Sequence, residues 1–300
     1  MPRLEFAGDS ILDNMVTTIA YAHQPPISTH TLHLIRTTLV NGPFLAFLCL
    51  TLSTPVARSE ITSDDFGNFS TIQTTTFSYI WKFMRHTSPN VGYAQQACLT
   101  RYRSVRTNIC DAMERGTCYP WALLARLDAP KFFSDIIESL LGAIYIDSRG
   151  SIAACEAFLS RLGIMRYLQR VMEGNVALLH PKEELGILAD VEKVKYVVKK
   201  VEEVEQGGGR LSCGVWVGKR EIVKVGRGIS VIEVETRGAE EAGRILKAER
   251  AKKVEKGYPD EQEAEQGPVM PNSDDKMDGI DESDGESMAY ETANEEFQPF

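Results

Sequence analysis

The chain has 300 residues, 43% of them hydrophobic, so it is long enough for one or two domains and can bury a substantial core. Its formal net charge is −9, but residues 251–300 hold 4 of the 33 basic and 15 of the 42 acidic residues. The other 250 residues therefore carry 29 basic and 27 acidic side chains, which leaves a nucleic-acid partner open but confines its contacts to local basic patches.

Several classes of protein are excluded by simple patterns. The six cysteines show neither a C-x-x-C pair nor zinc-ligand spacing, so we expect reduced thiols in an intracellular protein of the cytoplasm or nucleus. The N-terminus lacks a basic segment followed by an apolar stretch, which argues against a secretory signal. The longest apolar run, Pro43 to Leu50, is too short for a bilayer that needs ~20 residues, so we expect a soluble protein with no membrane partner.

The first part of the chain is expected to be helical. Apolar periodicity and breaker residues predict helices over 3–22, 30–41, 44–50, 77–86, 91–115, 121–127, 130–150, 151–159 and 164–173. Ser28 or Thr29 is expected to cap the second helix. Residues 59–76 are rich in Ser, Thr, Asp and Gly and are expected to form an exposed loop. The pattern predicts an all-α domain that ends near residue 175.

After His180 the period of the pattern changes. A short helix is expected over 182–188, followed by three strands over 194–204, 211–217 and 221–225. The last expected element is a helix over 236–252. Residues 207–209 are expected to turn the chain between the first two strands, and Gly218 joins the second strand to the third. From about residue 255 the sequence is acidic and poor in aromatic residues, so we expect a disordered tail over 255–300.

The helix expected over 130–150 carries two carboxylates inside an apolar run. Asp135 and Glu138 are three residues apart, so they share one face of the helix, and Gly142 follows on that face one turn later. A glycine in the middle of a helix costs about 1 kcal/mol relative to alanine. That cost is explained if a second helix approaches closely at Gly142. Buried carboxylates there need a cation or another partner.

The second helix is expected at the N-terminus. Glu5 and Asp9 are four residues apart on one face, with Gly8 beside them. If the two helices pack at their glycines, four carboxylates converge, and such a cluster repels itself unless a hard dication binds in it. Ligands that are all oxygens favour Mg²⁺ or Mn²⁺ over zinc.

These two segments resemble known motifs. Residues 3–13, RLEFAGDSILD, resemble the signature of ribonuclease III domains, and residues 130–150 are similar to the second acidic motif of the family in its Dicer form. The family's LxxLRxxLVNN helix resembles residues 32–41, and segments 80–86 and 119–121 look like the insertion of fungal Dicer-like proteins of the second class. The resemblance covers roughly residues 2–250.

The resemblance implies a domain organisation and an activity. We expect an all-α ribonuclease III domain over 1–175, an α-β-β-β-α double-stranded-RNA-binding-like domain over 180–252, and the acidic tail. The implied activity is Mg²⁺- or Mn²⁺-dependent endonucleolytic cleavage of double-stranded RNA in RNA silencing or RNA processing, with 5′-phosphate and 3′-hydroxyl products. A second ribonuclease III domain, from an identical or another chain, is the implied partner.

The resemblance also assigns roles to residues. It makes Glu5, Asp9, Asp135 and Glu138 metal ligands, although acid pairs at this spacing are usually solvated helix surface. It gives Lys131, one turn before Asp135, a contact with the substrate phosphate; the alternative is a lysine that only covers the start of its helix.

The RNA-binding-like domain departs from the family where its last helix is expected to begin. The usual Lys-Lys-x-Ala-Lys is replaced there by residues 236–242, TRGAEEA, whose two glutamates would weaken binding to phosphates. Basic residues on or near the strands either compensate or form an ordinary solvated face: Lys199, Lys200, Lys219, Arg220, Lys224 and Arg227.

The chain begins at the ribonuclease III signature, where family members have further helices upstream, and it holds one such domain. We therefore expect a shortened paralogue or an incomplete gene model. The alternative to an enzyme is a non-catalytic double-stranded-RNA-binding or dimerising regulator, and a third possibility is a metal-binding scaffold with no RNA partner.

Overall fold

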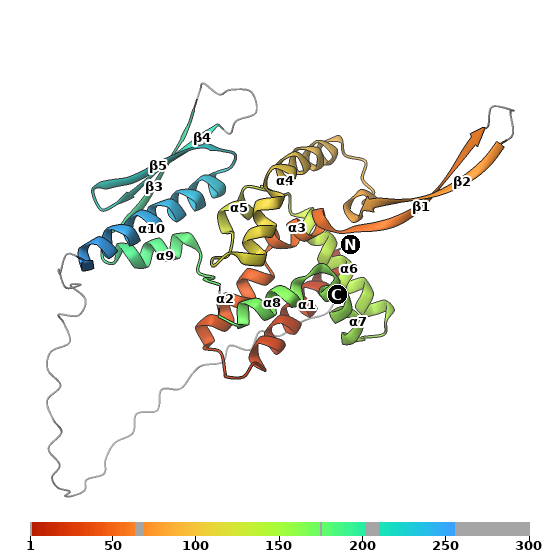
Figure 1. Cartoon of the computed structure of the whole chain (residues 1–300), viewed down its shortest axis with the longest axis horizontal. Helices are drawn as coiled ribbons and strands as arrows, with labels where there is room; N and C mark the ends of the chain where they lie inside the picture. The colour runs from red at the N-terminus through yellow and green to blue at the C-terminus, as the bar shows by residue number, and fades with distance from the viewer. Residues whose placement is uncertain (1, 64–68, 175, 202–209, 256–300) are drawn as a thin grey trace, which may run out of the picture. The chain divides into compact units, whose positions relative to one another are not determined.

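The structure, a computed structural model, describes residues 2–63, 69–174, 176–201 and 210–255 (Figure 1). The first part is mostly helical, as the sequence predicts. Its helices are α1 (Pro2–Tyr21), α2 (Thr29–Leu39), α3 (Gly42–Thr51), α4 (Pro89–Arg115), α5 (Trp121–Ala125), α6 (Phe132–Asp147), α7 (Ile152–Leu162) and α8 (Ile164–Met172).

Polar side chains fix where the early helices begin. The Ser28 hydroxyl accepts a hydrogen bond from the Thr31 backbone N–H, which confirms Ser28 as the cap of α2. Asn41 caps α3, because its Oδ1 accepts from the Phe44 N–H at 2.9 Å. The Asn41 amide also donates to the Tyr119 hydroxyl at 2.8 Å, so this side chain joins distant segments of the helical part.

The expected loop over 59–76 is wrong for its described residues, because 59–63 and 69–76 lie in two paired strands of a β-hairpin. β1 (Ser53–Ser63) pairs antiparallel with β2 (Phe69–Tyr79), with Ser53 opposite Tyr79. The strands are rich in Thr, whose branched Cβ favours extended backbone, but most of their residues are exposed. A strand exposed on both faces lacks the apolar alternation that would have predicted it.

The helix expected over 77–86 is also wrong. Residues 77–79 complete β2, and the segment continues as the short 3-10 helix η1 (Ile80–Phe83). Trp81 in η1 is buried and packs edge-on against Phe133 of α6, with ring centroids 6.1 Å apart. Trp81 therefore anchors the end of the hairpin to the core.

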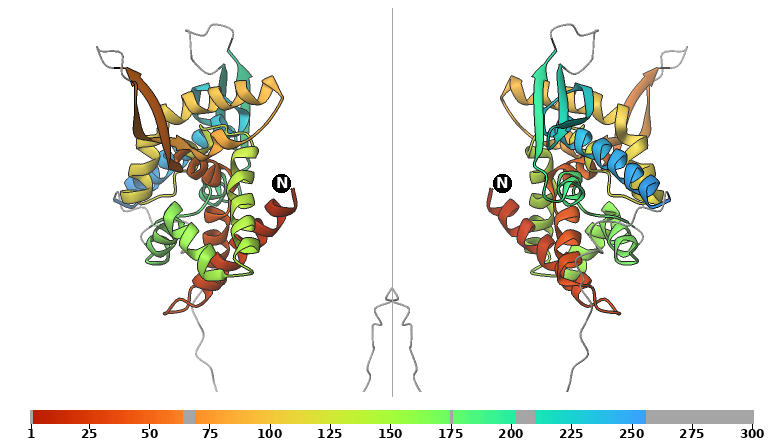
Figure 2. Two further views of the ribbon diagram at one scale, coloured as in Figure 1. Left: turned by 90° about the vertical axis from the view of Figure 1, so that its right-hand side faces the viewer. Right: turned by 90° about the vertical axis from the view of Figure 1, so that its left-hand side faces the viewer.

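Two helices dominate the core of this part. α3 is buried almost all round, since each residue from Phe44 to Leu50 is buried. α6 carries buried Phe133, Ile137 and Leu141 and crosses α1 in close contact (Figure 2). Burying each of these large side chains stabilises the fold by about 1.5–3 kcal/mol, so the core fixes the position of α6.

The second part has its own hydrophobic core and the predicted α-β-β-β-α order. α9 (Pro181–Ala189) is followed by an antiparallel sheet in the order β3 (Val194–Lys200), β4 (Leu211–Val217) and β5 (Arg220–Gly228), and by α10 (Val231–Glu255). Gly218 joins β4 to β5 with a φ of +58°, as expected for a tight turn. The turn expected over 207–209 and the tail expected from 255 lie outside the described residues, apart from the tail's first residue, which ends α10. The domain limits 1–175 and 180–252 stay a prediction.

The last helix begins five residues earlier than predicted. Ser230 accepts a hydrogen bond from the Glu233 N–H, and the Glu233 carboxylate accepts from the Ile229 N–H at 3.1 Å. This Ser-x-x-Glu arrangement is the sequence signature of a helix start. Residues 236–242 therefore lie inside α10 and not at its beginning.

Within the described residues, no single helix is both long enough and apolar enough to span a membrane. α2 and α3 meet that test only when taken together, and they are bent by 44° at their junction.

Candidate metal centre and basic groove

The candidate centre forms where α1 crosses α6 with almost no space between their backbones. A Cβ added to Gly8 would lie 1.8 Å from the Glu138 carbonyl oxygen, and one added to Gly142 would lie 2.2 Å from the Leu4 carbonyl oxygen. No real side chain tolerates such a contact, so both positions require glycine. The close approach predicted from Gly142 is confirmed, and it places the acidic residues of the two helices next to each other.

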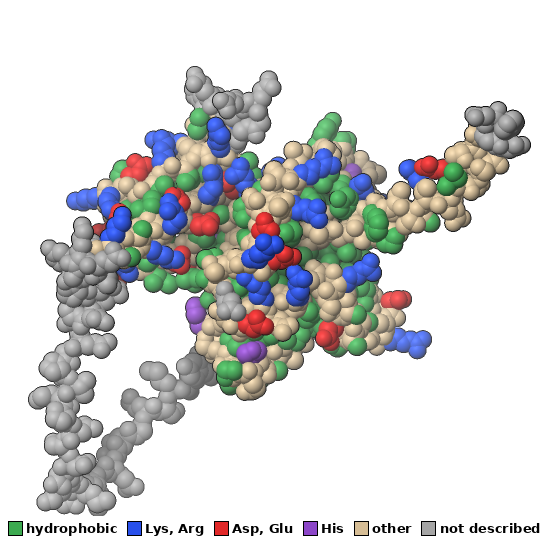
Figure 3. All heavy atoms as spheres, viewed as in Figure 1, with side chains coloured by type: hydrophobic (Ala, Val, Ile, Leu, Met, Phe, Trp, Pro, Cys, Tyr) green, Lys and Arg blue, Asp and Glu red, His purple; other side chains and the backbone are tan. Residues whose placement is uncertain are grey.

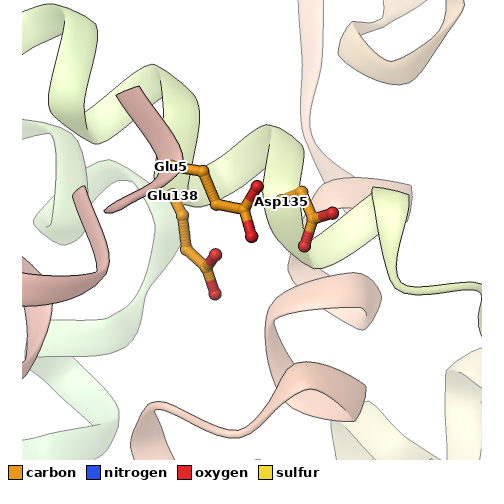
Figure 4. Close-up of side chains that lie close together, drawn as sticks. All are labelled: Glu5, Asp135 and Glu138. Atoms are coloured by element: carbon orange, nitrogen blue, oxygen red, sulfur yellow. The ribbon is translucent and has the colours of Figure 1, made fainter. Parts of the chain in front are cut away.

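Three of the four predicted ligands come together at this crossing. One carboxylate oxygen from each of Glu5, Asp135 and Glu138 lies within 4.8 Å of the others. Glu5 reaches from α1 toward the two α6 side chains, and the three carboxylates lie around a common space (Figure 4). Their separation suits three oxygen ligands of one hard divalent cation.

Asp9, the fourth predicted ligand, is exposed and falls outside this group of described residues. It is nevertheless close enough to act through its charge. Burial, and after it the charges of Asp9 and Asp135, together raise the pKa of the Glu138 carboxyl to about 7. A carboxyl in this environment is stabilised by a cation, so its surroundings fit a metal ligand.

Lys131 provides a positive charge at the centre. Its ammonium group donates hydrogen bonds of 2.5 Å to Glu5 Oε1 and to Asp135 Oδ1. Those two bonds raise the pKa of Lys131, with the Asp135 bond contributing most. The side chain is 72% exposed, so it can swing away without disturbing the core. Lys131 is thus placed to turn from the carboxylates toward an anionic ligand.

The six basic residues predicted to bind RNA are spread over the second part. Lys199 and Lys224 line a groove of about 450 Å³ on the sheet formed by β3, β4 and β5. Lys200 ends β3 and Lys219 lies in the turn before β5. Arg220 forms an ion pair of 2.7 Å with Glu249, and Arg227 has a φ of +57° near the end of β5. Figure 3 shows basic side chains recurring over this part of the chain, with acidic ones among them.

Sequence reasoning missed two residues of that groove, Lys195 and Trp216. The alternation of β3 contained the signal for Lys195, because residues 195, 197 and 199 must share one side of a strand. Trp216 faces the same groove from β4, directly opposite Lys195 in the strand register.

Comparison with known proteins gives consistent matches. The family model for the ribonuclease III domain matches residues 2–149, and the model for the double-stranded-RNA-binding domain of Dicer-like protein 2 matches residues 174–281. Dicer-like protein 2 of Coccidioides immitis is 42% identical over 249 residues, which is 83% of this chain and 17% of that protein. Dicer-like protein 2 of Cryphonectria parasitica is 37% identical over 260 residues, 82% of this chain and 18% of that protein.

The chain thus spans less than a fifth of the length of these curated relatives. A solved structure titled "Structure of Dicer from Pichia stipitis" matches 81% of this chain at 18% identity, with a TM-score of 0.32. That score is too low to support an argument about the fold.

Proposed function

The chain belongs to the ribonuclease III family and carries a Dicer-like double-stranded-RNA-binding domain, and on that premise we propose that it cleaves double-stranded RNA by hydrolysing phosphodiester bonds. The observation that supports this proposal is the convergence of Glu5, Asp135 and Glu138 from two helices far apart in the sequence. Ribonuclease III domains are typically dependent on divalent metals. The all-oxygen ligand set favours Mg²⁺ or Mn²⁺ for this one.

Each residue of the centre has a distinct role in the proposed reaction. Glu5, Asp135 and Glu138 would hold the metal, and Asp9 adds negative charge beside it. When bound, the metal supplies Lewis-acid stabilisation of the scissile phosphate and lowers the pKa of a water molecule. Lys131 releases Glu5 and Asp135 and binds a phosphate oxygen, which positions the strand and offsets its charge.

The described residues contain one such acidic cluster, so we propose that a second ribonuclease III domain is needed to cut both strands. One cluster orients one phosphate at a time. The partner would be an identical chain or a domain of another chain, and the site of action an RNA-silencing or RNA-processing pathway in the cytoplasm or nucleus.

The order of the reaction in protein concentration tests this function. With Mg²⁺ and a labelled RNA duplex, cutting of both strands should rise with the square of the protein concentration when the protein is dilute, while nicking of one strand rises linearly. A mixture of parent and Glu138→Gln chains should give products nicked in a single strand. The 5′ ends of the products should carry phosphate.

A metal-loaded dimer that cuts neither strand would refute the proposed nuclease activity. If that dimer still binds duplex RNA, the result would favour the alternative function, a non-catalytic RNA-binding regulator. Supplying a separate ribonuclease III domain is the control, because it separates a missing partner from an inactive centre.

We also propose that the second part binds duplex RNA mainly through charge. The apparent association constant should then fall steeply as salt rises from about 50 to 200 mM, because binding to phosphates releases counterions. Charge reversal at Lys200 and Lys219, neither of which lines the groove, should flatten the slope of log K against log [salt] by about one for each phosphate that the variant no longer neutralises. Electrophoretic mobility shift at a series of salt concentrations gives this slope. A slope unchanged by both reversals would show that these two residues do not bind the RNA.

A further inference from the structure

The sheet of the second part has two unlike faces. Val194, Tyr196 and Val198 of β3 point to the face that α9 and α10 cover, where they pack in the hydrophobic core. The opposite face carries Lys195, Val197 and Lys199, and the groove of about 450 Å³ lies there. No described residue of α9 or α10 lines this groove, so the face is open among the residues that the structure describes.

An aromatic side chain, Trp216, lines the groove. Trp216 of β4 is half-buried and lies beside Gly214, whose missing side chain leaves space for the Glu221 carboxylate and for the edge of the indole. A Cβ added to Gly214 would be 3.4 Å from the indole nitrogen of Trp216 and 2.8 Å from Glu221 Oε1. The ring is therefore held in place by the sheet while part of it remains accessible.

Three lysines line the same groove as this ring. Lys195 is opposite Trp216 in the strand register, Lys224 is opposite Gly214, and Lys199 lies four residues along β3. Four residues of a strand span about 13 Å, so the positive charges follow the length of the groove. Glu221 is the one acidic residue among those lining it, which leaves a net positive surface.

The charges elsewhere in this part are arranged differently. Within the described residues, several basic side chains near α9 and α10 are each bound to a glutamate: Lys182 to Glu235, Arg220 to Glu249, Arg244 to Glu241 and Lys247 to Glu184. None of the three groove lysines has such an ion pair in the part of the chain that the structure describes. Their charges remain available for an anionic ligand.

We propose that this groove binds unpaired RNA nucleotides, with a base stacked on Trp216 and the flanking phosphates bound by Lys195, Lys199 and Lys224. A positively charged groove that contains an aromatic ring is the arrangement by which single strands are bound without sequence preference. In an A-form duplex the bases are stacked on each other inside the helix, so a ring recessed in a groove cannot reach their faces. An acidic peptide would match the lysines but offers no flat group for the indole.

This site is separate from the acidic cluster, and its occupation does not require cleavage. The part of the chain that is proposed to hold duplex RNA would thereby also hold a single-stranded end or loop next to the duplex.

The test uses the full chain in EDTA at low salt, with a fluorescein-labelled oligonucleotide of 12 uridines. Anisotropy gives the dissociation constant, and quenching of tryptophan emission reports stacking. Trp216→Leu should weaken binding about tenfold and remove the quenching. Lys195→Glu should also weaken binding, and Lys252→Glu on α10, with the same change in net charge, should not. Circular dichroism melting confirms that each variant is folded.

Three competitors determine what the groove recognises. Unlabelled single-stranded RNA should displace the probe, whereas an abasic strand of equal length should compete at least several-fold less well. If a polyglutamate peptide competes as well as the single strand, the groove binds acidic peptides and the proposal fails. It also fails if the parent chain does not bind the probe, or if Trp216→Leu weakens binding to a blunt RNA duplex by the same factor.

Discussion

Replacing Glu138 by glutamine should abolish the stabilisation of the protein by Mg²⁺ or Mn²⁺ and lower RNA cleavage by about 100-fold or more. A ligand that binds only the folded state stabilises it by mass action, by ~2.7 kcal/mol at a concentration 100 times its dissociation constant. An amide keeps the size of Glu138 but loses the negative charge that a hard dication requires. Mutating a residue that only hydrogen-bonds to a metal ligand typically lowers metal affinity or activity by about 10–100-fold. Loss of a direct ligand should therefore lower the cleavage rate by at least about as much.

Melting temperature with and without metal measures the first effect, and cleavage of a labelled duplex measures the second. Asp147→Asn is the matched control, because Asp147 is an exposed carboxylate on the same helix. It should leave both readings unchanged. A metal-induced shift that survives in Glu138→Gln would show that the ion binds elsewhere.

Without metal, Glu138→Gln should be more stable than the parent protein at alkaline pH. Burial and the neighbouring acids raise the pKa of Glu138 to about 7 in the folded protein, above its value in the unfolded chain. The unfolded state therefore loses this proton at lower pH than the folded state, so ionisation of Glu138 destabilises the fold as pH rises from about 4.5 to above 7. In EDTA at pH 8, Glu138→Gln should melt at a higher temperature than the parent. Near pH 4 the difference should vanish.

The second large effect is expected at the crossing of α1 and α6. Gly142→Ala would place a Cβ 2.2 Å from the Leu4 carbonyl oxygen, so the two helices must move apart. Forcing an extra carbon into a packed interface typically costs about 1–3 kcal/mol, which exceeds the gain of at most ~1 kcal/mol from alanine's helix propensity. The shift should also carry Glu5 away from Asp135 and Glu138. We therefore expect both a lower melting temperature and a weaker metal-induced shift.

Gly186→Ala is the matched control for this prediction. Gly186 is also inside a helix, α9, but an added Cβ there meets no atom within 4 Å. That substitution should be neutral or stabilise the protein by about 0.5–1 kcal/mol. Thermal melting of the two variants in parallel measures the difference. Equal stability of the two variants would mean that the helices do not depend on the close approach at the glycine.

Much of the helical part could be predicted because its signals are local. The apolar periodicity of α1 and α6 and the glycine at 142 were sufficient to predict two helices in close contact with their acids together. The hairpin of β1 and β2 could not be predicted in this way, since both of its faces are mostly exposed and its strands carry no alternation. The early start of α10 was predictable from Ser230 and Glu233 but was obscured by the charged residues that follow.

The candidate centre was predictable in its residue types but not in its geometry. Helical spacing placed Glu5 and Asp9 on one face, but it could not show that Asp9 lies outside the group that Glu5 forms with Asp135 and Glu138. The position of Lys131 between Glu5 and Asp135 depends on the distance between two helices, which is a tertiary property. The groove around Trp216 likewise depends on the register of three strands.

The most direct test of the metal centre is to locate the ion itself. Crystals of the chain soaked in Mn²⁺ should show an anomalous difference peak at the crossing of α1 and α6, within direct coordination distance of Glu5, Asp135 and Glu138. The same soak of Glu138→Gln crystals should show no peak there. A parent crystal in which the three carboxylates remain without Mn²⁺, while the ion occupies other sites, would contradict the assignment.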